Sequence, residues 1–164
     1  ATGFEVGTSY ARRAGYEIVG RGGKTLTEKW SSGVRTLHGI HSHGFPNCFI
    51  MGAQQSAFTV NFPHAISEQS QHIAYLVEHA LRSGTRTLEA SSAAEDAWVE
   101  TIIQLARFGR DYLEACTPGY YNNEGNLSVL SAQNGFYGAG SEAFFKLMRE
   151  WREAGKLEGL EQGK

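Results

Sequence analysis

Three histidines lie close together in the stretch HGIHSHGF, at His38, His41 and His43. Histidine is the commonest metal ligand and a frequent acid–base group. We expect this stretch to be extended, and in a strand His41 and His43 share one face while His38 lies on the other. No carboxylate or thiolate accompanies them at the spacing of a zinc site. The pattern therefore argues against a metal site.

Other motifs with known chemistry are missing from the sequence. There is no G-x-G-x-x-G, no P-loop and no G-x-S-x-G, so the chain by itself gives no argument for a dinucleotide-phosphate site or a serine nucleophile. His64, His72 and His79 fall on one predicted helix, where a half-exposed helix surface is the commoner explanation. Cys48 and Cys116 lie far apart, which favours free thiols and a reducing, cytoplasmic location.

One strand–loop–helix unit offers a binding geometry. The predicted strand 48–52 ends at Gly52, the loop AQQSAFTV follows, and a helix begins at Asn61. Backbone N–H groups and the positive end of the helix dipole meet there, which favours an anion or an electron-rich ligand edge. A plain α/β crossover has the same geometry, so both interpretations stay open.

The composition is that of an ordinary globular chain. Its 164 residues are 41% apolar and 20% charged, with a net charge of −2. Such a balance gives no electrostatic footprint for nucleic acid or for an anionic membrane. No stretch approaches the ~20 apolar residues of a membrane span, and residues from Ala1 onward do not have the basic-then-apolar layout of a signal peptide.

The pattern divides the chain into two regions. Residues 1–84 read as short strands and turns that feed one long helix, as in an α/β fold, with strands at 36–40 and 48–52. Thr25 and Glu28 have capping-box spacing and should begin a short helix that buries Trp30. The long helix runs from the N-cap Asn61 to Gly84. Its predicted apolar face consists of Ile66, Ile73, Ala74, Val77, Ala80 and Leu81.

Residues 85–164 read as mainly helical. Ser92 and Glu95 form a second predicted capping box, which opens a helix to about residue 108 with Trp98 and Ile102 on one stripe. Another helix runs from Ser141 to Gly155 and buries Phe144, Leu147, Met148 and Trp151. The long aromatic loop 117–140 between them is expected to be ordered and to line a pocket.

Several motifs together resemble one enzyme family. The opening ATGF, the block GRGGKTLTEKWSSGVRTLHGIHSHGFPNCFIMG, the helix after it and SSAAEDAWVETI follow one another in the order found in the carboxy-terminal third of flavin-dependent Baeyer–Villiger monooxygenases. L-x-E-K-W, G-F-P-N-x-F and E-D-A-W-V are specific in combination. The stretch CTPGYYNNEG is similar to the branch that acts on bulky or cyclic ketones.

The resemblance implies a fold and a reaction. Residues 1–84 would be the returning part of a Rossmann-like FAD-binding domain, and residues 85–164 a helical region. The implied enzyme uses FAD, NADPH and dioxygen to convert ketones to esters or lactones through a C4a-peroxyflavin. The cofactor carries that chemistry, and protein groups supply orientation and electrostatics.

The resemblance also assigns cofactor contacts. The helix N-terminus at Asn61 and Phe62 matches the segment beside the flavin ring, where its dipole would stabilise negative charge on the reduced flavin. Thr2 and Gly3 would lie near NADP. Tyr120 stands where many relatives have a tryptophan near the nicotinamide ribose, and a phenol has a different hydrogen-bond reach from an indole.

The ketone contacts are assigned in the same way. The loop that lines the substrate pocket in relatives, and varies with substrate, corresponds here to Ser56, Ala57, Phe58 and Thr59. No residue of this chain is expected to be a catalytic acid or base, and no metal is expected.

The start at Ala1 reads as the end of a buried strand, which predicts a piece of a longer polypeptide with FAD- and NADP-binding parts upstream. Two alternatives remain: a related flavin monooxygenase that oxygenates amines or sulfides, and a non-catalytic structural remnant. In isolation, the uncovered apolar faces predict oligomerisation or aggregation.

Overall fold

A computed structural model of the chain describes residues 11, 14–106 and 132–164. The predictions for Thr2, Gly3 and Tyr120, and most of the predicted loop 117–140, lie outside these residues. The elements in chain order are the 3-10 turn η1 (Arg21–Gly23), α2 (Leu26–Lys29), α3 (Phe62–Ser83), β1 (Thr87–Ala90), α4 (Ser92–Leu105), α7 (Ser141–Ala154) and β2 (Leu160–Gly163).

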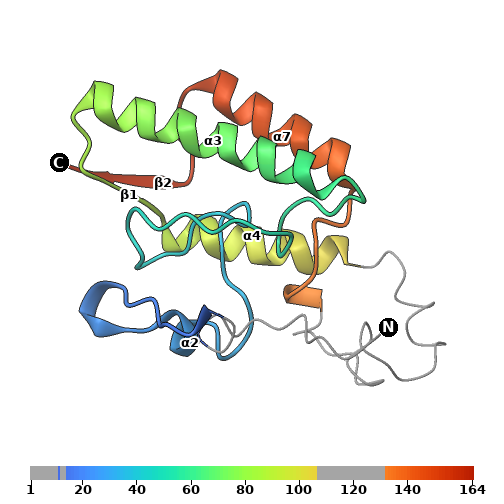
Figure 1. Cartoon of the computed structure of the whole chain (residues 1–164), viewed down its shortest axis with the longest axis horizontal. Coiled ribbons are helices and arrows are strands. Elements are labelled where there is room, and N and C mark those ends of the chain that lie inside the picture. The colour runs from blue at the N-terminus through green and yellow to red at the C-terminus, as the bar shows by residue number, and fades with distance from the viewer. Residues whose placement is uncertain (1–10, 12–13, 107–131) are drawn as a thin grey trace.

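The long helices form two layers around an irregular middle segment. α3 and α7 lie side by side, and α4 lies across from them with the chain between 36 and 60 in the space between (Figure 1). The largest hydrophobic core cluster of the protein contains side chains from α3, α4, α7 and the segment 36–60, among them Ile40, Ala65, Ile102 and Phe144. A second hydrophobic cluster lies around Leu26 and Trp30.

The only sheet in the described part of the chain is small. β1 and β2 pair antiparallel, with Thr87 opposite Gly163 and Ala90 opposite Leu160. Helices and strands together make a mixed α and β structure, in agreement with the predicted class at that level. No described helix is long and apolar enough to cross a bilayer.

The predicted helix boundaries are largely confirmed. The capping box of α2 is formed in both directions, between Thr25 and Glu28, and Trp30 is buried. Asn61 caps α3 through its side chain, and Gly84 ends that helix in the left-handed conformation that glycine adopts without a steric penalty. α7 spans the predicted range and buries Phe144 and Met148, with Leu147 and Trp151 half-buried.

The two strands predicted at 36–40 and 48–52 are wrong. His38 and Gly39 have φ values of 56° and 70°, so the chain turns at this point, and only an isolated bridge joins Leu37 to His41. Asn47 also has positive φ, and its side chain accepts from the Leu88 N–H and donates to the Arg86 carbonyl. One asparagine side chain thus makes hydrogen bonds at the edge of β1, and the segment around it forms no strand.

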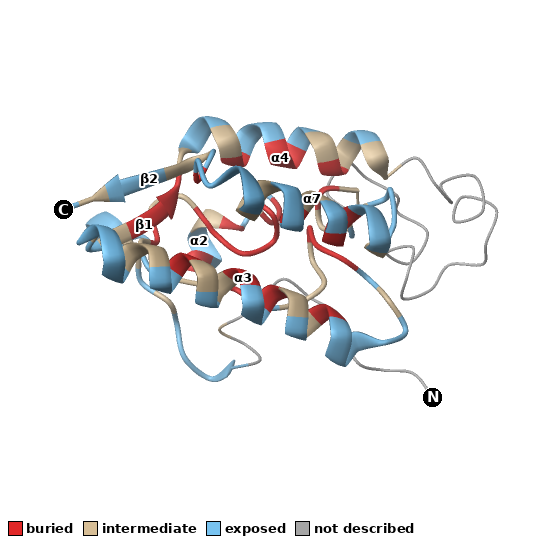
Figure 2. Ribbon diagram, turned by 90° about the horizontal axis from the view of Figure 1, so that it is seen from above, coloured by how far each residue is buried: buried red, intermediate tan, exposed pale blue. Residues whose placement is uncertain are grey.

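The apolar face predicted for α3 is only partly buried: Ile66, Ile73 and Ala80 are half-buried, and Ile73 and Ala80 pack against the core clusters. The helix buries Ala65, Gln69, His72 and Leu76, whereas Val77 and Leu81 of the predicted face are 43% and 79% exposed. Figure 2 shows the buried positions of α3 on the side toward the middle of the molecule. The apolar period was real, but polar side chains that find hydrogen bonds or ring contacts fill the inward positions. His72 is therefore a core residue, which corrects the expectation of a half-exposed surface.

The start of α4 differs by one residue from the prediction. Ser91, not Ser92, is the N-cap, and its hydroxyl accepts from the Ala94 N–H. Glu95 closes no capping box, because its carboxylate turns inward to other partners. Trp98 and Ile102 are buried as predicted.

Candidate functional site

The predicted ketone loop is held in place by two buried glutamines. Gln69 of α3 accepts from the Gly52 N–H and donates to the Gly52 carbonyl and to Ser56 Oγ. Gln55 lies in the loop itself and is fully buried. Ser56 and Ala57 are buried beside it, while Phe58 is 57% exposed and Thr59 is half-buried. Of the four predicted ketone contacts, Phe58 and Thr59 are therefore the two that offer side-chain surface to a ligand.

Phe58 has an aromatic partner from another part of the chain. Its ring stacks on Phe136 with centroids 4.2 Å apart and an interplanar angle of 11°. The two backbones are joined directly, since the Tyr137 N–H donates to the Ser56 carbonyl at 2.9 Å. Tyr137 in turn stacks on Trp98 of α4. The result is an exposed aromatic wall on a well-packed base, which suits an apolar ligand.

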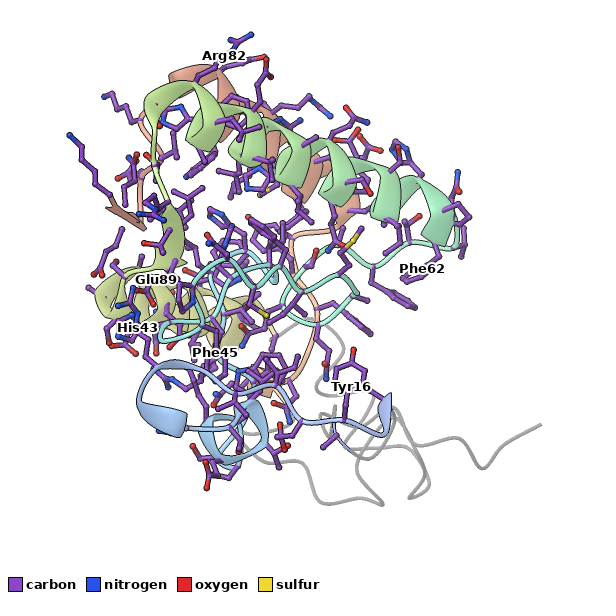
Figure 3. All side chains as sticks on the ribbon, turned by 60° about the vertical axis from the view of Figure 1, so that its left-hand side comes forward. Tyr16, His43, Phe45, Phe62, Arg82 and Glu89 are labelled. Atoms are coloured by element: carbon purple, nitrogen blue, oxygen red, sulfur yellow. The ribbon has the colours of Figure 1, made fainter. Side chains whose placement is uncertain are left out.

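The helix N-terminus lies at the end of this loop. Asn61 accepts from the His64 N–H through its side chain, and its own N–H donates to Thr59 Oγ1. Pro63 has no N–H, and within the described part of the chain the Phe62 N–H has no acceptor. Phe62 is 47% exposed at this end of α3, opposite the Arg82 end (Figure 3). An exposed donor and the positive end of a 22-residue helix are thus available to an electron-rich group.

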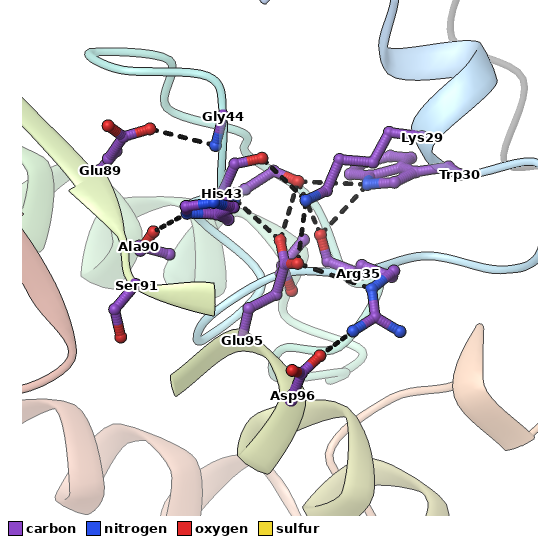
Figure 4. Close-up of polar contacts among 12 residues, drawn as sticks. Lys29, Trp30, Arg35, His43, Gly44, Glu89, Ala90, Ser91, Glu95 and Asp96 are labelled. Atoms are coloured by element: carbon purple, nitrogen blue, oxygen red, sulfur yellow. Dashed lines mark hydrogen bonds and ion pairs between the residues drawn. The ribbon is translucent and has the colours of Figure 1, made fainter. Parts of the chain in front are cut away.

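The buried carboxylate of Glu95 connects α4 to α2 and to the segment around His43. Glu95 accepts from the His43 N–H at 2.8 Å and from Ser42 Oγ at 3.1 Å on one oxygen, and from Lys29 Nζ at 2.9 Å on the other. Arg35 Nε lies 3.5 Å from the same oxygen as Lys29 and also pairs with Asp96 (Figure 4). Because hydrogen-bond donors or cations face both oxygens, this buried charge is compensated.

This network joins the motifs that were far apart in sequence. Lys29 belongs to L-x-E-K-W and Glu95 to E-D-A-W-V. Gly44 of G-F-P-N-x-F donates its N–H to Glu89, whose carboxylate also pairs with Arg21. The motifs thus have a structural reason: they lock the irregular middle segment onto α2, β1 and α4.

Three histidines form a cluster inside the core. His38 packs edge-on against Trp98, His41 lies 6.3 Å from His72 between ring centroids, and His72 packs against Trp151. Burial lowers the pKa of His38 to about 3, of His41 to about 4 and of His72 to about 2. The described residues contain no group of three side chains able to hold a metal ion. These rings are neutral packing groups at neutral pH.

No protein-family model matches the chain. Over 163 residues it is 50% identical to pentalenolactone D synthase from Streptomyces arenae. The matched region covers 98% of this chain and 28% of that protein. It is 39% identical over 160 residues to Baeyer-Villiger monooxygenase 4 of a Dietzia species, covering 98% of the chain and 26% of that protein. The chain is homologous to part of the Baeyer–Villiger monooxygenases. It spans roughly a quarter of the length of these relatives.

Solved structures agree with this homology. The polycyclic ketone monooxygenase of Thermothelomyces thermophila superposes with a TM-score of 0.84 at 34% identity, over 95% of this chain and 25% of that one. Two further comparisons bear on cofactors. The FAD-binding monooxygenase hmp7 of Hypomyces subiculosus is 38% identical over 98% of this chain and 27% of that protein. A steroid monooxygenase solved with NADP bound has a TM-score of 0.75 at 25% identity, over 90% of this chain and 26% of that one.

The sequence patterns missed the side chains that hold the site together. Gln55, Gln69 and Glu95 are polar residues at buried positions, and no periodicity marks them. The one available signal for Glu95 was its place in a motif shared with the family. For the glutamines the signal was weaker: AQQS interrupts the chain between two apolar stretches, which is also how an ordinary loop looks.

Proposed function

We propose that this chain is the ketone-contacting and flavin-flanking part of a Baeyer–Villiger monooxygenase. The enzyme converts a ketone, bulky or cyclic, to an ester or lactone with FAD, NADPH and dioxygen. The observation that carries the proposal is the 50% identity to a pentalenolactone D synthase over almost the whole chain. The aromatic wall of Phe58 and Phe136 supports it, because a polycyclic ketone presents mainly apolar surface.

The α3 N-terminus fits a flavin. FAD, when bound and reduced by NADPH, activates dioxygen for attack on the ketone carbonyl. The free Phe62 N–H and the helix dipole would stabilise negative charge at the edge of that ring system. Asn61 keeps the first turn in shape, since its side chain occupies the His64 N–H. Thr2, Gly3 and Tyr120 remain the proposed NADP contacts.

The two exposed side chains of the loop would orient the ketone. Ser56 and Ala57 are buried, so their role in the proposal is to shape the loop, and Phe58 and Thr59 make the contact. Residues 1–84 would form the last part of a Rossmann-like FAD-binding domain. The remaining FAD- and NADP-binding parts would belong to the same longer polypeptide. A cytoplasmic location stays a prediction from the cysteine usage.

The direct experiment is turnover by the intact enzyme that carries this sequence. We expect NADPH oxidation to rise when a bicyclic or polycyclic ketone is added, and an ester or lactone to form in equal amount. Equal stimulation by amines or sulfides, with no ester formed, would instead support the related class of flavin monooxygenases. No stimulation by any of these substrates would leave the structural-remnant alternative.

Substitution of the loop tests the ketone contact separately. Phe58→Ala or Thr59→Ala in the intact enzyme should change the ratio of kcat/KM between a bulky and a small ketone, with FAD content unchanged. A single methylene of contact in a hydrophobic pocket is worth about 1–3 kcal/mol, or roughly 10- to 200-fold, so the ratio should change by at least this order for the substrate that used the lost contact. Loss of FAD with an unchanged ratio would contradict the assignment of this loop.

A further inference from the structure

The side chain of Gln55 uses its full hydrogen-bonding capacity inside the protein. Its Oε1 accepts from the Thr36 N–H at 3.0 Å and from the Thr36 hydroxyl. Its Nε2 donates to the carbonyls of Val34 at 2.8 Å and Gln133 at 2.9 Å. A side-chain amide offers two donors and one acceptor oxygen with two lone pairs, so nothing is left unpaired.

The backbone of Gln55 is used as completely as its side chain. Its N–H donates to the Gly135 carbonyl at 2.7 Å, and its carbonyl accepts from Trp98 Nε1 at 3.0 Å. The residue has φ of 54°, a left-handed conformation that residues other than glycine and asparagine seldom adopt. A strained backbone at a fully buried position is held only because its surroundings determine it, and such positions gather at functional sites.

Gln55 connects the two segments that carry the aromatic wall. One is its own loop, which presents Phe58 three residues later, and the other is the segment 133–136, which presents Phe136. Gly39 also packs directly beneath, because a Cβ there would come within 2.7 Å of the Gln54 carbonyl oxygen. The separation of the two rings is therefore set by the bonds of Gln55 together with the direct bond from the Tyr137 N–H to the Ser56 carbonyl.

We propose that Gln55 is a positioning residue that determines ketone specificity by fixing Phe58 against Phe136. The proposal rests on the proposed function, since it assumes that this wall contacts the ketone. Gln55 itself is buried and touches no ligand. It acts through the loop, so its removal should alter the fit of the ketone while leaving flavin binding and the reduction of the flavin by NADPH unchanged.

The chain offers a matched control in Gln133. Its side-chain Nε2 donates to the same Val34 carbonyl at 2.8 Å, and it is also buried. Gln133→Ala removes a hydrogen bond of the same kind at the same place but leaves the hydrogen bonds of Gln55 to Thr36, Val34 and the Gln133 carbonyl in position. Gln55→Glu is the isosteric second variant, which keeps the acceptor oxygen for Thr36 and loses the two donated bonds.

The experiment measures the intact enzyme and its Gln55→Ala, Gln55→Glu and Gln133→Ala variants. For Gln55→Ala we expect KM for a polycyclic ketone to rise about tenfold, the loss expected for roughly one misplaced contact. FAD content and the rate of flavin reduction without ketone should stay within about twofold. Gln55→Glu should change KM in the same direction, and Gln133→Ala should not. Equal effects of Gln55→Ala and Gln133→Ala on KM, or loss of FAD in both, would overturn the proposal in favour of a general structural role.

A second readout does not depend on turnover. Crystal structures of the variants should show the Phe58 and Phe136 rings separated beyond their present 4.2 Å in the Gln55 variants and still stacked in Gln133→Ala. Rings that stay stacked without Gln55 would overturn the positioning role even if KM changed. Separated rings in an enzyme without ketone-dependent activity would instead preserve the positioning role and refute the proposed function.

Discussion

At the scale of single residues, Glu95 shows how one charge can organise an irregular segment. It is buried and compensated by Lys29, Ser42 and the backbone of His43. Breaking such a group from one side leaves unpaired polar atoms in the core, which costs more than the pair contributes when intact.

We therefore expect Glu95→Ala to lower the free energy of unfolding by about 3–5 kcal/mol. Glu95→Gln keeps the size and one acceptor, so its loss should be smaller. The control is Glu150→Gln, which removes an exposed pair with Lys146 and should change stability by less than about 0.5 kcal/mol. Denaturant unfolding of the purified protein measures all three, and similar losses for Glu95→Ala and Glu150→Gln would contradict the role of Glu95.

The histidine cluster makes a prediction about pH. Desolvation first, and the neighbouring His41, His38 and Arg152 charges next, hold the pKa of His72 at about 2, and burial holds that of His41 at about 4. In the unfolded chain both titrate near their ordinary pKa of about 6.5. Above that pH neither state binds protons, so these groups add no pH dependence. As the pH falls below 6.5, only the unfolded chain takes up protons, so stability is lost.

Each such histidine should cost about 1.4 kcal/mol per pH unit between its unfolded and folded pKa. His72→Leu should therefore unfold with a shallower pH dependence between pH ~6 and ~4.5. Its stability at pH ~7.5 should be equal or higher, since neither ring nitrogen has a hydrogen-bond partner among the residues that the structure describes. The same change at the exposed His64 is the control. A thermal-unfolding series with parallel pH profiles for His72→Leu and the parent would contradict this account.

At the scale of elements, α3 has one residue with two separable roles. Asn61 caps the helix through its side chain, and its position beside the free Phe62 N–H places it at the proposed flavin edge. Aspartate caps as well as asparagine, but it adds a negative charge where the reduced flavin would place its own.

We expect Asn61→Ala to lower stability by about 1 kcal/mol. Asn61→Asp should keep the stability of the parent and yet lower the reduction potential of bound FAD in the intact enzyme. A spectroscopic redox titration measures the potential. An unchanged potential in Asn61→Asp, with the helix intact, would place the flavin elsewhere.

The elements also show how far the sequence could lead. Helix ends were predictable because their signals are local: Thr25 with Glu28, Asn61, Gly84 and Gly155 each act within one turn. The irregular conformation of 36–40 and 48–52, where strands were predicted, was not predictable. The positive φ at His38 and the pairing of the Asn47 side chain with β1 depend on partners that are distant in sequence. Tertiary contacts thus determined the backbone conformation of these segments in spite of their strand-like composition.

The candidate site was predictable to a similar extent. The resemblance pointed to the loop and the α3 N-terminus, whose role as a site stays a prediction, and in the structure the Asn61 N–H donates to Thr59 Oγ1. The stack of Phe58 on Phe136 joins residues far apart in sequence, as do the bonds of Gln55. Nothing in a single sequence reports such pairings.

At the scale of the whole molecule, the outward face of α3 is a feature that a stable monomer rarely shows. Together with the neighbouring loop it forms an apolar surface groove lined by Met51, Ile73, Ala74, Val77 and Leu81. Contiguous exposed apolar surface of this kind marks an interaction site or a tendency to aggregate.

The 164-residue chain on its own should therefore self-associate as its concentration rises. The double variant Val77→Gln with Leu81→Lys should reduce this, since it replaces the two exposed large apolar side chains of the groove on α3. Arg149→Gln on the exposed side of α7 is the control. Sedimentation velocity over a range of concentrations measures the effect, and a parent chain that stays monomeric throughout would contradict the prediction.

The central claim is the transfer of oxygen to a ketone, and labelled dioxygen tests it most directly. The intact enzyme would be supplied with NADPH, a polycyclic ketone and isotopically labelled dioxygen, and the product analysed by mass spectrometry. The account predicts an ester or lactone that carries one labelled oxygen atom, in the ring or chain position next to the migrated carbon. NADPH oxidation that yields only hydrogen peroxide with every ketone tried, or an oxygenated amine or sulfide in its place, would contradict the claim.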